Sequence, residues 1–189
     1  RDINVIAFME FPPKDISENY LQLKELVKQK GITCIYAVQG QSYQIGKKAW
    51  IDILYPMEDQ ARLENIGGDN ENNRSLVMRL SYKNTSILFT GDIEREVEEY
   101  LSDIYDFEVD ILKVAHHGSR TSSTEPWIQI IDPQIAVIQV GRNIFGHPHP
   151  EVEERLLEQG ASVYRSDRDG AVICTFINGK WNVYTMVNE

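Results

Sequence analysis

The sequence predicts an α/β domain with mixed sheets, and three features of the chain support this class. Short apolar or β-branched runs recur along it, segments with helical spacing separate several of them, and turn signals pair some neighbouring runs as hairpins. A chain of 189 residues is long enough to bury a single core without help from a disulfide or a metal. The composition, with 42% hydrophobic and 25% charged residues, excludes collagen-like, coiled-coil and wholly disordered proteins.

The first expected elements are a strand and a helix. Residues 3–9 form a nearly continuous apolar run, which predicts a buried strand that starts close to the first residue. Asp15 and Glu18 fit a capping box, and apolar residues then recur at helical spacing until Gly31 ends the predicted helix.

Two strands and one long loop are expected next. The strand at 32–38 is rich in β-branched residues, and the strand at 50–55 alternates around Asp52. Residues 56–74 are polar and contain Gly67-Gly68, which predicts a long loop. Loops of this length inside a compact domain are usually functional or mobile.

The rest of the chain alternates strands and helices between two hairpins. The turn signals of these hairpins are Lys83-Asn84 and Asn178-Gly179. The expected elements are strands 75–81 and 86–90, a helix from 93 to about 101, a strand at 109–115, a helix from Pro126, a strand at 135–140, a helix at 151–159, a strand at 161–165 and the closing hairpin.

The charge of the chain is acidic but unevenly distributed. Nineteen basic against 29 acidic residues give a formal net charge of −10, which argues against nucleic-acid binding through bulk charge. Residues 94–110 contain eight carboxylates and one Arg, whereas residues 113–149 contain three basic residues and all four histidines. Any anion site is therefore expected in the second stretch.

Membrane spans and disulfides are not expected in this sequence. No apolar run approaches the ~18 residues of a transmembrane helix, and no signal peptide opens the chain. Cys34 and Cys174 are a single distant pair flanked by apolar residues, and we interpret them as free core thiols.

Three predicted strands end in polar residues that are suited to chemistry. Asp92 follows the strand at 86–90, His116 and His117 follow the strand at 109–115, and His147 follows the strand at 135–140. Ligands of α/β sheets collect beyond the carboxyl ends of strands, so we expect these side chains to converge. Carboxylate and imidazole together suit zinc, manganese or iron.

Each of these residues also has a purely structural interpretation. Asp92 fits a helix N-cap, and the adjacent histidines fit a surface loop. His147, between Gly and Pro, fits a rigid loop position, and His149 fits a cap or surface position before Pro150. The hydroxyl cluster at 119–124 fits either phosphate donors or an ordinary loop before a helix. The acidic residues around 94–99 are most simply a solvated helix face.

Five stretches of the chain together resemble one protein family. They are Asp69–Val77, Leu88–Asp92, Leu112–Ser123, Val140–Pro150 and Ser166–Val172. In order, spacing and wording they are similar to the metallo-β-lactamase-type domain at the C-terminus of ComEC-type competence proteins. These proteins are membrane channels that internalise DNA during natural transformation. The resemblance covers essentially the whole chain.

The resemblance implies a fold and a metal site. The fold is an αββα sandwich with mixed sheets, and the site lies at one edge of the two sheets and holds two divalent ions, Zn or Mn. Asp92 matches the residue that bridges the two metals, and His117 matches a further ligand. His116 and His147 would serve catalysis beside them.

The resemblance also implies a substrate. A metal-polarised water would hydrolyse DNA phosphodiesters, in a single strand or a duplex, with a nearby imidazole relaying a proton. Arg120, Arg142, Ser119 and Asn73 would contact the substrate, the two arginines at its phosphates. The membrane channel portion of the same protein would be a partner, and this domain would face outward.

The chain departs from the family pattern in one respect. The first metal motif of this superfamily, His-x-(His/Asp)-x-Asp-His, is absent from these 189 residues. We therefore expect residues 1–189 to be a single domain truncated at its N-terminus, the later two-thirds of the family domain. Alone it would bind metal weakly or not at all and be inactive, and its exposed sheet edge would invite dimers.

Two alternatives to a nuclease remain open from the sequence. One is a non-catalytic module that binds DNA or partner proteins of the uptake machinery. The other is a different hydrolase of the same superfamily, acting on phosphocholine esters or a small phosphodiester.

Overall fold

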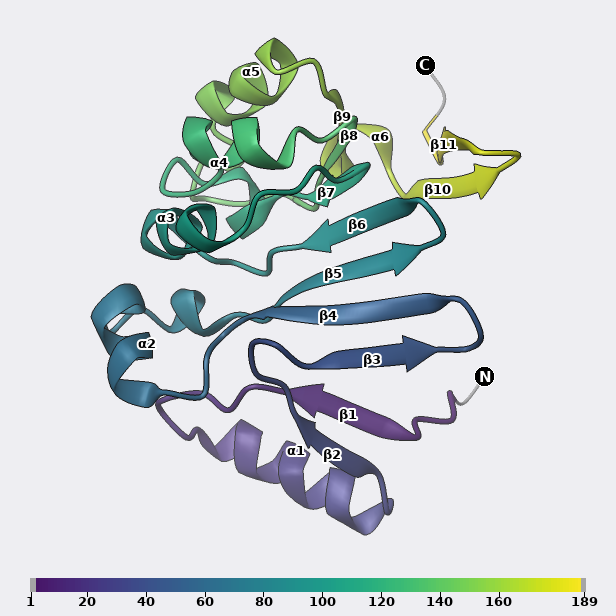
Figure 1. Ribbon diagram of the computed structural model, residues 1–189. Coiled ribbons are helices and arrows are strands. Elements are labelled where there is room, and N and C mark those ends of the chain that lie inside the picture. Colours follow the sequence, from purple (N-terminus) through teal and green to yellow (C-terminus); the bar gives the residue numbers. More distant parts are fainter. Residues whose placement is uncertain (1–2, 188–189) are drawn as a thin grey trace.

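The computed structural model describes residues 3–187, and its largest feature is a seven-stranded mixed sheet (Figure 1). The elements in chain order are β1 (Ala7–Glu10), α1 (Glu18–Gln29), β2 (Thr33–Tyr36), β3 (Ser42–Ile45), β4 (Ala49–Tyr55), α2 (Gln60–Gly67), the 3₁₀ helix η1 (Glu71–Arg74), β5 (Val77–Tyr82), β6 (Thr85–Phe89), α3 (Arg95–Ile104), β7 (Ile111–Lys113), the 3₁₀ helix η2 (Ala115–Gly118), α4 (Glu125–Ile131), β8 (Ile135–Ile138), α5 (Pro150–Glu158), β9 (Ser162–Arg165), α6 (Ser166–Asp169), β10 (Val172–Ile177) and β11 (Lys180–Thr185). The prediction of an α/β fold with mixed sheets is confirmed.

The large sheet has an antiparallel half and a parallel half. Its strand order is β3-β4-β5-β6-β7-β8-β9, with antiparallel pairing from β3 to β6 and parallel pairing from β6 to β9. Helices α3, α4 and α5 make the three parallel connections. Because such crossovers are right-handed and run in one direction along the sheet, all three helices lie on the same face. Figure 1 shows them clustered beside the parallel half.

The core lies between that face and the three helices. Leu88 of β6 and Leu112 of β7 are buried in one cluster with Leu101 of α3, Trp127 of α4 and Leu156 of α5. Burial of each such side chain stabilises the fold by about 1.5–3 kcal/mol. This packing fixes the parallel half of the sheet, and therefore the edge at which its strands end.

The other face of the sheet is apolar but less covered. Ile51, Leu80 and Ile87 stand opposite one another in the strand register and are only partly buried, and Phe89 is 37% exposed. The C-terminal hairpin β10–β11 is joined to this sheet through Trp181, whose Nε1 donates to Thr85 Oγ1 at 2.9 Å.

The N-terminal elements form a separate two-stranded parallel sheet, β1–β2, next to α1. The predicted strand at 3–9 is shorter than expected, because residues 3–6 lie outside β1 and are exposed. Among the described residues, β1 pairs with β2 alone, so few contacts extend it. The predicted capping box at Asp15 and Glu18 is wrong, since Ser17 caps α1 by accepting from Tyr20 N at 3.2 Å.

The predicted long loop at 56–74 is also wrong. It contains α2 and η1, and α2 begins where Asp59 Oδ1 accepts from Arg62 N at 3.2 Å. Leu63 is the one large apolar side chain of α2 that is buried, so the helix has little of the periodic signal by which a helix is recognised. Strand β3, which pairs with β4, was not predicted either.

The second half of the chain follows the expected order. The hairpin β5–β6, the helices α3, α4 and α5, the strands β7, β8 and β9 and the final hairpin lie within a few residues of their predicted positions. Both cysteines are free thiols, as predicted, although each is only partly buried. Among residues 3–187, no helix has the length and apolarity needed to cross a bilayer.

The acidic helix contains one buried carboxylate, which contradicts the expectation of a solvated face throughout. Glu98 of α3 is 0% exposed and accepts from Ser123 N at 2.6 Å and Thr124 N at 2.8 Å. Burial raises the pKa of Glu98 to about 7, although the two backbone donors act in the opposite direction. The carboxylate therefore anchors the turn that leads into α4.

This burial predicts that the protein loses stability as the pH rises. The unfolded chain releases the Glu98 proton near 4.5 and the folded protein near 7, so between these values the folded state binds more protons. Relative to Glu98→Gln, the wild-type free energy of unfolding should fall by up to about 3 kcal/mol from pH 5 to pH 8. Urea unfolding at several pH values measures this difference. Parallel curves for the two proteins would contradict it.

Candidate metal centre

The carboxyl ends of β6, β7 and β8 bring the predicted site residues together. Asp92 follows β6, His116 and His117 lie in η2 after β7, and His147 lies in the loop after β8. His117 Nε2 is 3.7 Å from Asp92 Oδ2, and the ring centroids of His116 and His147 are 5.4 Å apart. Because the three strands are parallel neighbours, these residues share one edge of the sheet.

The two adjacent histidines lie in a strained turn. His116 (φ 46°), His117 (φ 55°) and Gly118 (φ 79°) have consecutive positive φ angles, which cost a non-glycine residue about 1 kcal/mol or more each. A side chain at Gly118 would place its Cβ 2.6 Å from Pro148 Cβ. Close packing against the His147 loop therefore requires glycine and helps to hold the turn.

The imidazole of His117 is oriented by a backbone hydrogen bond. Its Nδ1 lies 2.6 Å from Gln139 O, a carbonyl that can only accept, so Nδ1 carries the proton. Nε2 then faces Asp92 Oδ2 at 3.7 Å, and without a second proton on the ring it would present its lone pair there. A lone pair and a carboxylate that face the same space suit a divalent cation, and the carbonyl behind the ring is a typical second contact of a metal-binding histidine.

Asp92 is held in place by neighbouring residues and does not cap a helix. Glu94 is the N-cap residue of α3, so the structural interpretation of Asp92 as a cap is wrong. The backbone N of Asp92 donates to Ser75 Oγ at 3.0 Å, and Asp92 Oδ1 lies 3.5 Å from Lys113 Nζ. Lys113 Nζ also donates to Gly91 O at 2.8 Å, and burial lowers the pKa of this lysine.

Two residues near the site were missed in the sequence. Glu94 Oε1 lies 3.2 Å from His116 Nδ1, but without hydrogen-bond geometry, so that this buried nitrogen has no hydrogen-bond partner among the described residues. Asn72 Nδ2 lies 3.4 Å from Glu94 Oε1 and 3.5 Å from His116 Nε2. The Asn-rich stretch around Asn72 was the available signal, whereas Glu94 was hidden in a run of surface acids.

His147 lies between two other imidazoles. Its ring centroid is 5.4 Å from that of His116 and 5.3 Å from that of His149. Burial, and then repulsion from the neighbouring imidazoles, lowers the pKa of His147, which favours its neutral form near pH 7. His149 Nδ1 in turn lies 3.1 Å from Arg120 Nη2. The rings of His116, His147 and His149 thus form a row that leads from the site to Arg120.

The four expected substrate contacts divide into two groups. Ser119 and Asn73 are buried: the Ser119 hydroxyl lies 3.0 Å from Thr121 Oγ1, and Asn73 Oδ1 accepts from Glu94 N at 2.8 Å. Arg120 and Arg142 are exposed. Arg142 lines a cleft of about 580 Å³ together with His117, His147 and Phe145.

The described residues supply only part of a metal site. Within residues 3–187, no group of three or more His, Cys, Asp or Glu side chains is placed to hold a metal ion. The donor chemistry of Asp92 and His117 fits a divalent ion, and the rings of His116 and His147 lie beside them.

Comparisons with known proteins agree with this geometry. Residues 68–142 match the metallo-beta-lactamase superfamily model. The chain is 35% identical to ComE operon protein 3 of Bacillus subtilis (strain 168) over 91% of its own length and 21% of that protein. It is 29% identical to competence protein ComA of Neisseria gonorrhoeae over 73% of its length and again 21% of that protein. The chain thus spans about a fifth of the length of these relatives.

One solved structure supports the fold alone. CmlA, a diiron beta-hydroxylase from Streptomyces venezuelae, aligns with a TM-score of 0.54 and 10% identity over 95% of this chain and 40% of that one. Together with the superfamily match, this alignment confirms the fold class that the sequence predicted. The resemblance to competence proteins is confirmed by the two curated relatives.

The strained turn leads to a prediction about stability. His117→Gly should be more stable than His117→Ala by about 1 kcal/mol, because glycine adopts φ 55° without strain and both variants lose the same imidazole. Thermal unfolding of the two variants measures the difference. At Glu154, an exposed position inside α5, the order should be reversed by a similar amount, because glycine weakens a helix interior. Equal stabilities at His117 would mean that the turn is not strained.

Proposed function

We propose that this chain is part of a metal-dependent DNA nuclease in a DNA-uptake protein. The premise is that the chain has the metallo-β-lactamase fold and is homologous to ComEC-type competence proteins. The observation that carries the proposal is the pair formed by Asp92 Oδ2 and Nε2 of His117, a residue of the strained turn; the two atoms face each other at 3.7 Å. The imidazoles of His116 and His147 beside this pair support acid–base chemistry at the same edge.

Asp92 and His117 are the proposed metal ligands. A bound Zn or Mn ion would lower the pKa of a water molecule and stabilise charge on phosphoryl oxygens. The Gln139 carbonyl keeps the His117 lone pair on Nε2, and Lys113 restricts the Asp92 carboxylate. The proposal includes two ions in the intact domain, with the remaining ligands outside residues 1–189, and weak binding by this chain alone.

His147 and His116 are the proposed acid–base groups. The lowered pKa of His147 keeps its imidazole neutral near pH 7 and able to accept a proton. The ring of His116 lies beside that of His147, and its Nδ1 is 3.2 Å from Glu94 Oε1. Asn73 holds the backbone of Glu94, so its proposed part changes from substrate contact to positioning.

The exposed arginines are the proposed substrate contacts. Arg142 lines the cleft beside His117 and His147, and Arg120 contacts His149 on the other side. Both would bind phosphates of single-stranded or duplex DNA. Ser119 has its hydroxyl next to Thr121, so it would shape the loop that carries Arg120.

The cellular setting of the proposal rests on the resemblance to ComEC-type competence proteins. The chain would work with the membrane portion of the same protein, on the outer face, where incoming DNA is processed. Edge pairing through β3, one of the two edge strands of the large sheet, is the proposed route to any dimer.

One observation favours a second candidate, a non-catalytic module that binds DNA or partner proteins. Lys113 Nζ lies 3.5 Å from Asp92 Oδ1, so a positive charge already stands beside the proposed metal ligand. If no metal binds, this ion pair would stabilise the site as it is.

The nuclease proposal predicts a metal-dependent loss of activity in one variant. Asp92→Asn in the full-length protein should lower Mn- or Zn-dependent cleavage of labelled DNA by at least about 10–100-fold. Losses of this size are typical even for residues that only hydrogen-bond to a metal ligand. Bound metal should fall in parallel by elemental analysis. Asp15→Asn, an exposed acid distant in sequence from the site, is the matched control and should retain activity.

Two results would count against the nuclease. One is a full-length protein that does not cleave DNA with either metal supplied, and the other is unchanged cleavage by Asp92→Asn. The first result together with intact DNA binding would favour the non-catalytic module.

A further inference from the structure

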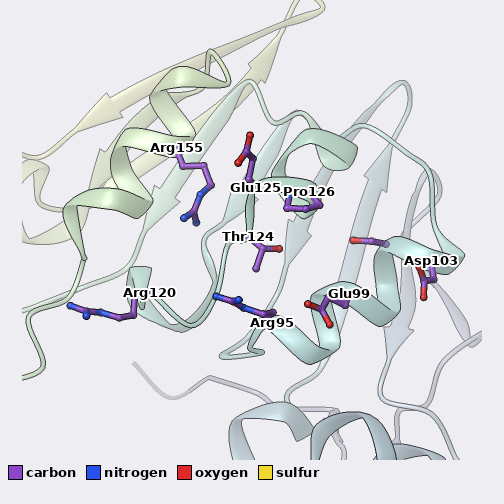
Figure 2. A pocket seen from close by; sticks show the side chains of 9 residues that line it. Arg95, Glu99, Asp103, Arg120, Thr124, Glu125, Pro126 and Arg155 are labelled. Carbon is purple, nitrogen blue, oxygen red and sulfur yellow. The ribbon is translucent and has the colours of Figure 1, made fainter.

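We propose that a pocket between α3, α4 and α5 binds a backbone phosphate of the nucleic acid, next to the one at the metal centre. The pocket has a volume of about 400 Å³ and is lined by three arginines, Arg95, Arg120 and Arg155 (Figure 2). We call it the arginine pocket. The inference rests on the proposed function for the identity of its ligand, and it adds a binding site outside the metal centre.

The positive charges of the arginine pocket are not neutralised by direct contacts. In the part of the chain that the structure describes, neither Arg95 nor Arg155 has a carboxylate within ion-pair distance. Arg120 has only Glu151, at 3.9 Å, in a pair that is exposed on both sides. Such exposed pairs contribute little and are screened by salt, so Arg120 remains able to bind an anion. The charge of Arg155 also acts on the buried carboxylate of Glu98, whose pKa it lowers.

Three carboxylates, Glu99, Asp103 and Glu125, also line the pocket, and Glu99 lies beside Arg95. Figure 2 shows the side chains of Arg95 and Arg155 extending towards the space beside Thr124. In the same view the carboxylate of Glu125 points away from this space, and Asp103 lies at the far end of the pocket. An anion is therefore favoured at the arginine end, where a planar guanidinium can donate two parallel hydrogen bonds to phosphate.

The loop beneath the pocket is held in a defined conformation. Arg155 donates to Ser123 O, and the buried carboxylate of Glu98 accepts from Ser123 N and Thr124 N. Arg95 N donates to Thr121 O at 2.9 Å, which ties the start of α3 to the same loop. Binding would thus order few additional groups, and a preorganised site retains more of its interaction free energy as affinity.

The pocket is continuous with the metal centre. Arg120 Nη2 lies 3.1 Å from His149 Nδ1, and the His149 ring lies 5.3 Å from that of His147. A strand with one phosphate at the centre would follow this row of side chains and bring another phosphate to Arg120 and the pocket. The ligand is therefore a phosphodiester chain, and a free phosphate would not explain the continuity.

The test measures DNA binding without hydrolysis. A short fluorescein-labelled oligo-dT is titrated with full-length protein in EDTA, and the anisotropy is followed at several salt concentrations. Arg95→Gln should weaken binding about tenfold, because a charge-assisted hydrogen bond is lost. The slope of log affinity against log salt should become shallower by about 0.7 for one lost phosphate contact. Arg95→Lys, which keeps the charge, should recover part of the affinity.

Two further arms separate phosphate binding in this pocket from general charge attraction and from base recognition. Lys180→Gln, an exposed cation on β11, is the matched control and should leave both affinity and slope unchanged. An abasic oligonucleotide should show the same dependence on Arg95, since phosphates and not bases are read. Melting temperatures confirm that each variant is folded.

Three outcomes would overturn the inference. The first is that the oligonucleotide does not bind. The second is that wild type and Arg95→Gln have equal affinity and equal salt slope. The third is that millimolar inorganic phosphate displaces the oligonucleotide from wild type and not from Arg95→Gln, while the salt slopes of the two proteins are the same. The binding assay contains no metal, so its result does not depend on cleavage. If binding depends on Arg95 in a protein that does not cleave DNA when metal is supplied, this site is upheld and the nuclease is rejected.

Discussion

The turn formed by His116, His117 and Gly118 is the constraint on which the candidate site depends. Its three positive φ angles are unfavourable for histidine, and they persist because the turn is held from several sides. The Gln139 carbonyl orients the His117 ring, Gly91 O accepts from His116 N, and Pro148 packs against Gly118. These contacts come from the ends of β6 and β8, so the sheet itself determines where both imidazoles point.

A second anchor, the buried Glu98 carboxylate, connects the fold to the loop that carries Arg120. A carboxylate that gives up solvation needs partners, and here two backbone N–H groups of the 123–124 turn supply them. The same turn is held by Arg155 from α5. Helices α3 and α5 thus fix a loop between the metal centre and the arginine pocket, and the strongly acidic α3 contributes structure as well as surface charge.

The sequence was most informative where signals are local. The Lys83-Asn84 turn predicted the β5–β6 hairpin, and the alternation of β-strands and helices after it predicted the parallel half of the sheet. It was least informative where a polar helix rests on few apolar contacts, as in α2, which is capped by Asp59 and buries Leu63. Glu94 and Glu98 lie one turn apart at the start of α3 and look alike in the sequence, yet one approaches His116 and the other is buried.

The sequence by itself determined the fold class and the order of elements in the second half of the chain. It also determined that one sheet edge brings together four side chains, those of Asp92, His116, His117 and His147. Each of these features depends on strand ends and turn residues, which are encoded within a few neighbouring positions. Only the tertiary structure decided which nitrogen of His117 faces Asp92, that Ser119 and Asn73 point inward, and that three arginines from distant segments share one pocket. Those features depend on side-chain burial and on contacts between residues far apart in the chain, which no local pattern specifies.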